Sequence, residues 1–198
     1  MRIPSAEEIR SLHERHAPSP AAFEAVFTHG LIVAEIAARV AGDAGLDVDA
    51  ELVRAGALLH DIGVYRLYGP DGRPDYAQYV RHGILGHELL REEGLPEAVR
   101  RFCSRHTGVG ITREDVRAQG LPLPPGDYVA ETPEERLVMY ADKFHSKSDP
   151  PTFVSALTYA ARVRRFGEDK TLAFKAMCED FGVPDLTPLA AAYGHAVV

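Results

Sequence analysis

Apolar residues recur at intervals of three and four along most of the chain, the spacing that places side chains on one face of an α-helix. The longest such stripe covers about residues 20 to 41 and is carried by Ala22, Val26, Val33, Ile36 and Val40. Two prolines open this segment and a glycine at position 42 follows it, as expected at the two ends of a helix. The pattern therefore predicts a long helix that buries one face.

Start signals in the sequence predict further helices on both sides of this segment. Ser5 with Glu8, and Thr132 with Glu135 after Pro133, have the spacing of a capping box, in which the side chains satisfy free backbone N–H groups. The other predicted helices cover about residues 49–61 and 79–93, a segment that follows Pro96 and ends at His106, a short stretch from Thr112, and about 152–166 and 168–181. The first helix is expected over residues 5–16.

Two segments between these helices are rich in glycine, proline and other turn formers. Residues 64–78 are expected either to cover a pocket or to form a solvated connection. The longer segment 107–131 is expected to be a functional loop, because unstructured loops of that length are uncommon in compact domains. The last two helices are interpreted as packing elements that also offer a possible contact for a homodimer.

Composition narrows the class of protein. A length of 198 residues suits one domain over 1–198, with a core of about 20–150 and a C-terminal helical extension over 151–198 that packs on it. The N-terminus is polar and no apolar run approaches the roughly 20 residues that span a bilayer, so no membrane partner is expected. Cys103 and Cys178 are far apart, which favours reduced thiols and a cytoplasmic location. The net charge of −7 argues against an extended nucleic-acid surface but allows a small phosphate pocket.

Several polar residues interrupt the predicted apolar faces. The central one is the pair His60-Asp61, which ends an apolar helical run and is followed by Ile62-Gly63, where the glycine is expected to end the helix. A carboxylate near a core costs several kcal/mol unless it is paired or bound to a metal. The residues that share this position on or beside an apolar face are His29, His60, Asp61, His82, His106 and Asp142. Together they predict a metal site.

The other histidines fit such a site less well. His87 is the rival of His82 on the same helix, because its neighbours at helical spacing include a charged residue. His13 and His16 lie in a charged segment and are expected on the solvated surface, and His195 lies in a short tail without ligand neighbours. The ligand set therefore offers only nitrogen and oxygen, which suits one or two divalent ions of Fe, Mn, Zn, Ni, Co or Mg and disfavours a thiolate site.

The order H…HD…H…H…D, with the Asp61-Ile62-Gly63 continuation, resembles the HD-domain metal-dependent phosphohydrolase superfamily. The stretches Arg105–Thr112, Gly120–Glu131 and Tyr140–Asp142 are also similar to a small, little-characterised prokaryotic group of HD hydrolases. The resemblance implies an all-α helical bundle with the metal site among its central helices. It implies that a first ion is held by His29, His60, Asp61 and Asp142, and that Asp61 bridges to a second ion held by His82 and His106.

The same resemblance implies hydrolysis of a phosphomonoester or phosphodiester, in a nucleotide or other small phosphorylated metabolite, by a metal-activated water. Asp61, His82 and His106 would then be the catalytic residues, with Asp61 positioning the water and accepting its proton. Many relatives carry a lysine directly after the Asp-Ile-Gly run, where this chain has Val64. The contact to the substrate anion is therefore expected from Lys143, Arg66, Arg105 or Lys147.

Two other functions are compatible with these residues. Some HD-fold proteins use a similar ligand pattern to hold a di-iron centre that activates O₂ and cleaves a C–C or C–P bond, so an oxygenase is the main alternative. A non-catalytic nucleotide-binding regulator ranks third, because all six expected ligands are present in the sequence.

Overall fold

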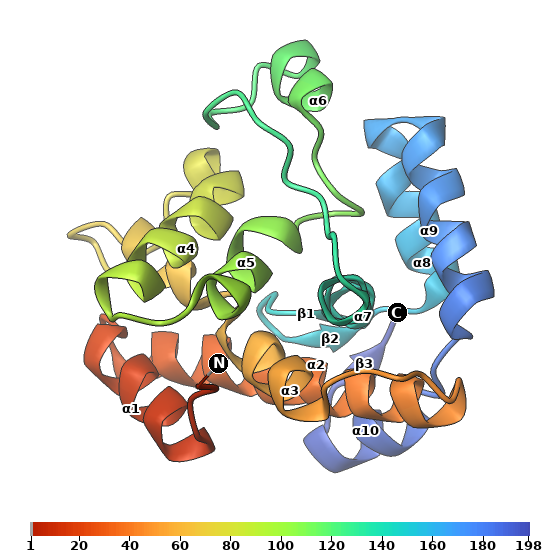
Figure 1. Cartoon of the computed structure of the whole chain (residues 1–198), viewed down its shortest axis with the longest axis horizontal. Coiled ribbons are helices and arrows are strands. Elements are labelled where there is room, and N and C mark those ends of the chain that lie inside the picture. Colours follow the sequence, from red (N-terminus) through yellow and green to blue (C-terminus); the bar gives the residue numbers. More distant parts are fainter. Residues whose placement is uncertain (1) are drawn as a thin grey trace.

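A computed structural model of the chain describes residues 2–198. Helices dominate it, as predicted, and five of them surround the centre of the molecule (Figure 1). These are α2 (Pro20–Asp43), α3 (Ala50–Leu59), α4 (His82–Glu92), α5 (Glu97–Arg105) and α7 (Pro133–Ala141). α2 packs against α3 and α7, and α4 packs against α5. The remaining elements cover the outside of this group.

The predicted helix starts are formed by the expected side chains. Ser5 and Glu8 make the capping box of α1 (Ala6–His16), and Thr132 and Glu135 make that of α7. A third capping box, at Thr112, begins the short α6 (Arg113–Ala118) within the long loop. These starts depend on hydrogen bonds between residues three positions apart, so the local sequence is sufficient to specify them.

Two apolar clusters hold the helices together. One joins α2 and α7 to the C-terminal helices through side chains such as Ile36, Tyr140 and Phe174. The other joins α1, α2, α3 and α4 through side chains such as Ile9 and Leu89. The first half of α2 contributes to the second cluster and its second half to the first, so the apolar stripe predicted for this helix connects the two clusters.

By length and composition α2 also meets the criteria for a membrane-crossing helix, with a mean hydropathy of 1.5. The sequence pattern did not predict this. Half of its apolar window is buried inside the fold, as in the core helix of a folded domain, and His29 lies on the buried side.

The residues after His60 differ from the prediction. α3 ends at Leu59, and a 3₁₀-helix, η1 (Ile62–Leu67), begins where a loop was expected; a second one, η2 (Tyr76–Arg81), precedes α4. Gly63 does not end a helix but lies against the backbone of α4. A Cβ atom at Gly63 would lie 2.1 Å from the carbonyl oxygen of His82 and 2.2 Å from the nitrogen of Gly86. The absent side chain thus lets η1 approach α4 closely, which places Asp61 near His82.

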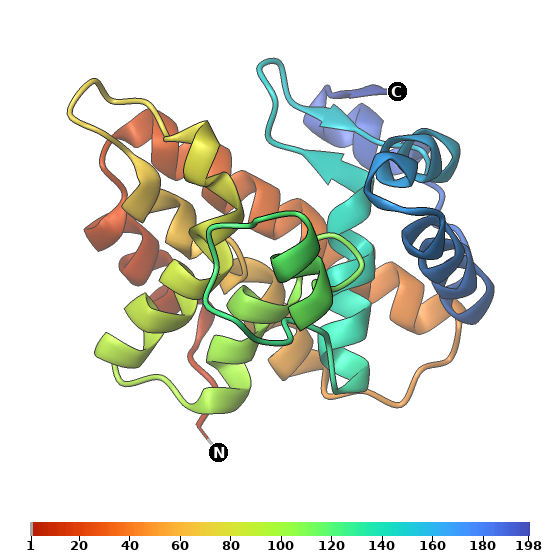
Figure 2. The same ribbon diagram turned by 90° about the horizontal axis from the view of Figure 1, so that it is seen from above.

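The C-terminal part contains elements that helical periodicity did not predict. α8 (Ala156–Val163), the 3₁₀-helix η4 (Arg164–Phe166) and α9 (Glu168–Phe181) correspond to the two predicted helices, but α10 (Thr187–Tyr193) was missed. So was a small sheet in the order β1-β2-β3. β1 (His145–Ser146) pairs antiparallel with β2 (Thr152–Phe153), and β2 pairs parallel with β3 (Ala196–Val197). In the view from above, the sheet lies beside α2 and close to the C-terminus (Figure 2).

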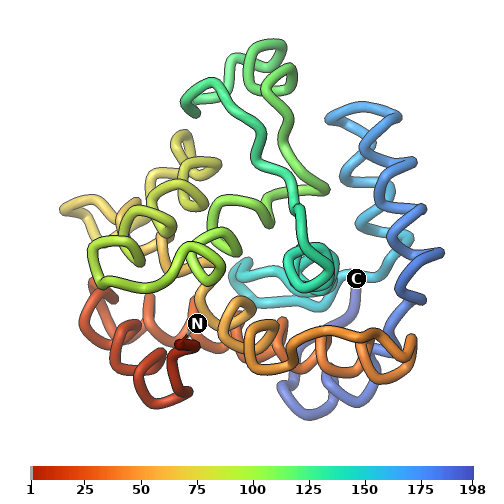
Figure 3. Tube along the Cα trace, viewed as in Figure 1, coloured from red at the N-terminus to blue at the C-terminus, as the bar shows by residue number. Residues whose placement is uncertain are grey.

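The Cα trace shows how chain-distant segments meet at the centre (Figure 3). The N-terminal α2, the middle helices α4 and α5, and the later α7 all converge there, while α8 and α9 stand on the opposite side from α4 (Figure 1). The ends of these central helices therefore face a common region, where the polar residues of the sequence pattern lie.

Candidate metal centre

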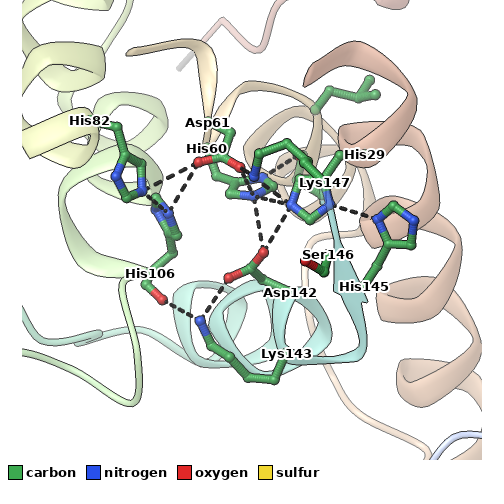
Figure 4. A network of polar contacts seen from close by, with 12 residues as sticks. His29, His60, Asp61, His82, His106, Asp142, Lys143, His145, Ser146 and Lys147 are labelled. Carbon is green, nitrogen blue, oxygen red and sulfur yellow. Dashed lines mark hydrogen bonds and ion pairs between the residues drawn. The ribbon is translucent and has the colours of Figure 1, made fainter. Parts of the chain in front are cut away.

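Six side chains meet at the centre of the molecule, five of them at the ends of helices and His29 from within α2 (Figure 4). His60, His106 and Asp142 are the C-cap residues of α3, α5 and α7, and His82 is the first residue of α4. At a helix end the backbone leaves the helical path, so a side chain there can turn inward without displacing apolar neighbours. Five of the six are buried, and the side chain of Asp142 is 17% exposed. The structure thus brings together all six residues that the sequence pattern selected.

Four of these residues form one compact group. The Nε2 atom of His29 lies 2.9 Å from Oδ1 of Asp142 and 3.2 Å from Nε2 of His60. Oδ2 of Asp61 lies 3.3 Å from each of these two Nε2 atoms. One ligand atom from each of the four residues lies within 4.8 Å of the others, a spacing that suits a single ion.

The other oxygen of Asp61 faces a second group. Oδ1 lies 3.3 Å from Nε2 of His82 and 3.5 Å from Nε2 of His106, and these two nitrogens are 2.9 Å apart. Asp61 therefore presents one oxygen to each group. This is the arrangement of a carboxylate that bridges two ions.

Hydrogen bonds to the other ring nitrogens define the tautomers at this site. Nδ1 of His60, His82 and His106 lies 2.6, 2.6 and 2.9 Å from the backbone carbonyl oxygens of Ala57, Tyr79 and Phe102. A carbonyl oxygen only accepts, so each Nδ1 carries the proton and donates it. In the neutral rings Nε2 is then unprotonated, and its lone pair points into the site. This is the state in which histidine binds metals.

This assignment makes the site a good fit for a cation. Burial lowers the pKa of His82 to about 4 and also lowers the pKa of His106, so both rings are neutral near pH 7. Two lone pairs then face each other at 2.9 Å, which is repulsive unless a positive charge lies between them. At His60 burial opposes protonation, but the carboxylates of Asp61 and Asp142 outweigh it and raise its pKa to about 9. Both groups therefore favour a positive charge among their ligand atoms, and a divalent ion is one source of it.

Two lysines lie at the carboxylates of the site. Lys147 pairs with Oδ2 of Asp61, and Lys143 donates to Oδ2 of Asp142 at 2.7 Å and to the carbonyl oxygen of His106 at 2.8 Å. Burial raises the carboxyl pKa values, but the adjacent ammonium groups, together with the histidines, hold the pKa of Asp61 and of Asp142 well below the usual range. Both carboxylates are therefore ionised and available as ligands.

The two arginines predicted for the substrate lie elsewhere. Arg66 pairs with Glu92 on the surface, and Arg105 pairs with Glu131 and donates to the carbonyl oxygen of Val129 at 3.1 Å. Neither lines the cavity at the site, whereas Lys143 and Lys147 do. Val64, at the position where relatives carry a lysine, also lines that cavity.

A buried histidine behind His29 was missed in the sequence. Nδ1 of His145, on β1, lies 2.9 Å from Nδ1 of His29, and its Nε2 lies 3.1 Å from Nδ1 of His195. The three rings are stacked, with centroids 5.2 Å apart at each step. Burial lowers the pKa of His145 to about 2, so it is neutral. If Nε2 of His29 binds metal, its Nδ1–H donates to His145, which in turn donates to His195.

His13 was predicted on the surface, and this is wrong. It is fully buried, with Nε2 3.0 Å from the carbonyl oxygen of Leu58 and Nδ1 2.8 Å from the hydroxyl of Tyr65. Tertiary packing of α1 on α2, α3 and η1 buries it, so the charged local sequence gave no signal. The rival His87 lies outside the cluster, 3.1 Å from the hydroxyl of Ser104.

The cluster opens into a cavity of about 730 Å³. One wall is formed by η2 and the start of α4, with Tyr76, Tyr79 and His82; another is formed by α8 and η4, with Tyr159 and Phe166. Residues 106–111, at the start of the predicted functional loop, also line it. Its volume lies within the range of sites for small molecules.

Comparison with known proteins supports this description. The family model of the HD domain matches residues 26–147. A protein of Methanocaldococcus jannaschii, described as uncharacterized, is 43% identical over 122 residues, and the tRNA (cytidine(56)-2'-O)-methyltransferases of Picrophilus torridus and Thermoplasma volcanium are 40% and 38% identical over 121 and 117 residues. The matches cover 60%, 61% and 59% of this chain, but only 65%, 31% and 30% of those proteins.

Solved structures share the fold. The HD domain of the phosphodiesterase PgpH from L. monocytogenes has a TM-score of 0.56 at 16% identity, over 93% of this chain and 98% of that one. The same domain in complex with cyclic-di-AMP has a TM-score of 0.55 at 17% identity, over 93% and 96% of the two chains. The chain therefore belongs to the HD-domain superfamily, as its histidine and aspartate motif predicted.

Proposed function

We propose that this protein is a metal-dependent phosphohydrolase that acts on a small phosphorylated molecule. The observation that carries the proposal is the position of Asp61, whose two oxygens face two separate groups of histidines at 3.3–3.5 Å. A carboxylate shared in this way suits a pair of divalent ions. When bound, such ions polarise phosphoryl oxygens and lower the pKa of a coordinated water toward neutrality.

The ligand roles follow the two groups. His29, His60, Asp61 and Asp142 would hold the first ion, and His82 and His106, with Asp61 as the bridge, the second. The backbone carbonyls that accept from Nδ1 of His60, His82 and His106 fix each ring with Nε2 toward the ion. The protein thus orients its ligands before substrate arrives, and little reorganisation is needed.

Asp61 and the two lysines would act on the substrate. Asp61 would orient the attacking water between the two groups. Lys147 pairs with Oδ2 of Asp61 and Lys143 with Oδ2 of Asp142, and both lysines line the cavity. Their ammonium groups are therefore placed to contact the phosphoryl oxygens, where charge develops in the transition state. They would replace the lysine that relatives carry at the position of Val64.

The cavity supports a substrate of nucleotide size. Its volume of about 730 Å³ exceeds that of a bare phosphate, and aromatic side chains line two of its walls. The structural neighbour PgpH binds cyclic-di-AMP in an HD domain of the same fold. We expect the substrate to be a phosphorylated nucleotide or a similar metabolite. An activity assay with both ester types would distinguish a monoesterase from a diesterase.

The test begins with protein purified without chelator. Its metal content is measured, and phosphomonoesters and phosphodiesters are then screened with and without O₂. Asp61→Ala should lose both metal retention and turnover, whereas Asp43→Ala, an exposed carboxylate on α2, should lose neither. Normal turnover by metal-free Asp61→Ala would refute the proposal, and O₂-dependent turnover of a substrate that is not an ester would favour the oxygenase.

A further inference from the structure

Some of the cationic side chains that line the cavity have a carboxylate partner and others do not. Three cations each have a carboxylate partner that also lines the cavity: Lys147 with Asp61, Lys143 with Asp142, and Lys170 with Asp115 at 2.5 Å. Within residues 2–198, the other two cations of the lining, Arg162 and Arg165, have no carboxylate within 4.0 Å. Both side chains are exposed where they line the cavity, so their guanidinium groups are accessible to an anionic ligand.

Local structure directs both arginines to the cavity. They are three residues apart at the end of α8 and in η4, so they lie on the same side of the helix. Val163 between them is buried, and Arg164 points elsewhere, pairing with Glu168 at 3.2 Å outside the cavity lining. The guanidinium of Arg165 lies 4.7 Å from the centroid of the Phe166 ring, a cation–π contact that orients it.

Tyr159 connects this wall to the metal centre. It lies one turn before the arginines on α8, lines the cavity, and packs on Phe174 with ring centroids 4.6 Å apart. Burial raises the pKa of its phenol, and the charges of Lys143 and Arg165 both act on it. α8 packs against the 3₁₀ turn η3 (Asp142–Phe144), and Tyr159 lines the same cavity as Lys143 and both arginines. A ligand extending from the cluster along Tyr159 would reach the arginines.

We propose that Arg162 and Arg165 form a second anion subsite, which holds a second phosphate group of a substrate whose scissile phosphate lies at the histidine–aspartate cluster. Guanidinium groups match phosphate oxygens with two parallel hydrogen bonds, which makes arginine suited to this role. Both residues lie beyond residue 147, outside the segment that matches the HD-domain family. The subsite rests on the proposed function for the role of the cluster, and it narrows the substrate to a compound with two separated phosphates.

Alkane phosphonates test this subsite independently of turnover. Their C–P bond is not hydrolysed by a phosphohydrolase, and work under nitrogen excludes O₂-dependent cleavage. Isothermal titration calorimetry on the metal-loaded protein compares a series of α,ω-alkane bisphosphonates of increasing length with the matched alkyl monophosphonates. At the length that spans both sites, we expect the bisphosphonate to bind roughly tenfold more tightly or better, the effect of about one charge-assisted hydrogen bond.

Variants test whether Arg162 and Arg165 cause the tighter binding of the bisphosphonate. The double variant Arg162→Ala/Arg165→Ala should lose the advantage of the bisphosphonate and keep the affinity for the monophosphonate. Arg164→Ala, which removes one positive charge from the same turn but outside the cavity, should keep both. The single variants Arg162→Gln and Arg165→Gln, checked by thermal unfolding, replace the double variant if it does not fold, and each should lose part of the advantage.

Three results would overturn the subsite: no length at which the bisphosphonate binds more tightly, an advantage that survives the double variant, or an equal loss in Arg164→Ala. Because binding is measured without catalysis, the subsite is confirmed or rejected even if no ester is hydrolysed. A bisphosphonate advantage that depends on Arg162 and Arg165, in a protein without esterase activity, would refute the proposed function alone.

Discussion

Replacing His145 by leucine removes the hydrogen-bond acceptor of His29 behind the metal centre, together with the contact to His195. In the folded protein, Nδ1 of His145 lies 2.9 Å from Nδ1 of His29, and its ring stacks on that of His29 at a centroid distance of 5.2 Å. Leucine fills a similar apolar volume but accepts no hydrogen bond. The tautomer of His29 that directs the Nε2 lone pair at the first ion then loses its partner. Asparagine at position 145 offers an amide oxygen near the place of Nδ1 and serves as the matched control.

The expected loss of metal affinity follows from the position of His145, which contacts the ligand His29 and is not itself a proposed ligand. Loss of a hydrogen bond that orients a ligating histidine typically costs about 10–100-fold in metal affinity, or about 1.4–2.7 kcal/mol. The loss should fall on the ion held by the His29 group. The other group receives its orientation from the carbonyl oxygens of Tyr79 and Phe102 and does not contact His145. Its affinity should stay within about twofold of the wild type.

Competition between the metal-free protein and a chelating dye measures both affinities. His145→Leu should lower the affinity of one site and His145→Asn should restore most of it. Equal affinities in all three proteins would show that the contact does not orient His29. An equal fall in both variants would show that the ring acts through packing and not through its hydrogen bond.

Three further predictions concern other parts of the molecule. Burial lowers the pKa of His13 to about 4 from an ordinary value of 6.5. Between these pH values the unfolded chain therefore binds a proton that the folded chain does not. The free energy of unfolding then falls by about 1.4 kcal/mol per pH unit as the pH decreases from 6.5 to 4. His13→Gln should make this slope shallower by one proton in urea unfolding between those pH values, and an unchanged slope would contradict the assignment. Gly63→Ala should lower the free energy of unfolding by several kcal/mol, because its Cβ would overlap the backbone of α4, whereas Gly42→Ala, where no atom lies within 4 Å, should be neutral or slightly stabilising; similar thermal midpoints for the two would disprove the close contact. Lys147→Met should retain metal and lose turnover by roughly a hundredfold, and unchanged turnover would remove Lys147 from the substrate site.

The sequence was sufficient for features that depend on local spacing. Capping boxes join residues three apart, and His29 and His106 lie on apolar stripes whose burial follows from helical periodicity. The convergence of six ligands was predictable because charged groups on buried faces need partners.

The features that were missed depend on pairing between distant residues. β1 and β2 have two residues each, too short to show a period, and β3 joins them from the far end of the chain. The burial of His145 follows from that pairing. Gly63 was interpreted as a helix terminator because sequence alone does not show that α4 lies against it. The helical extension was likewise partly predicted, with α10 missed because it is short.

The residues that would bind the metal span a long separation along the chain, from His29 to Asp142, and come from several different helices. In the unfolded chain these residues are far apart, so no preformed site exists there and metal binds almost only to the folded protein. Mass action then makes free metal a stabiliser: each tenfold rise in its concentration above the dissociation constant adds about 1.4 kcal/mol per ion to the free energy of unfolding. The midpoint of thermal unfolding should therefore depend on the metal concentration in the buffer and fall when a chelator is added. The resistance of this protein to heat and proteolysis would then vary with the metal supply of its surroundings.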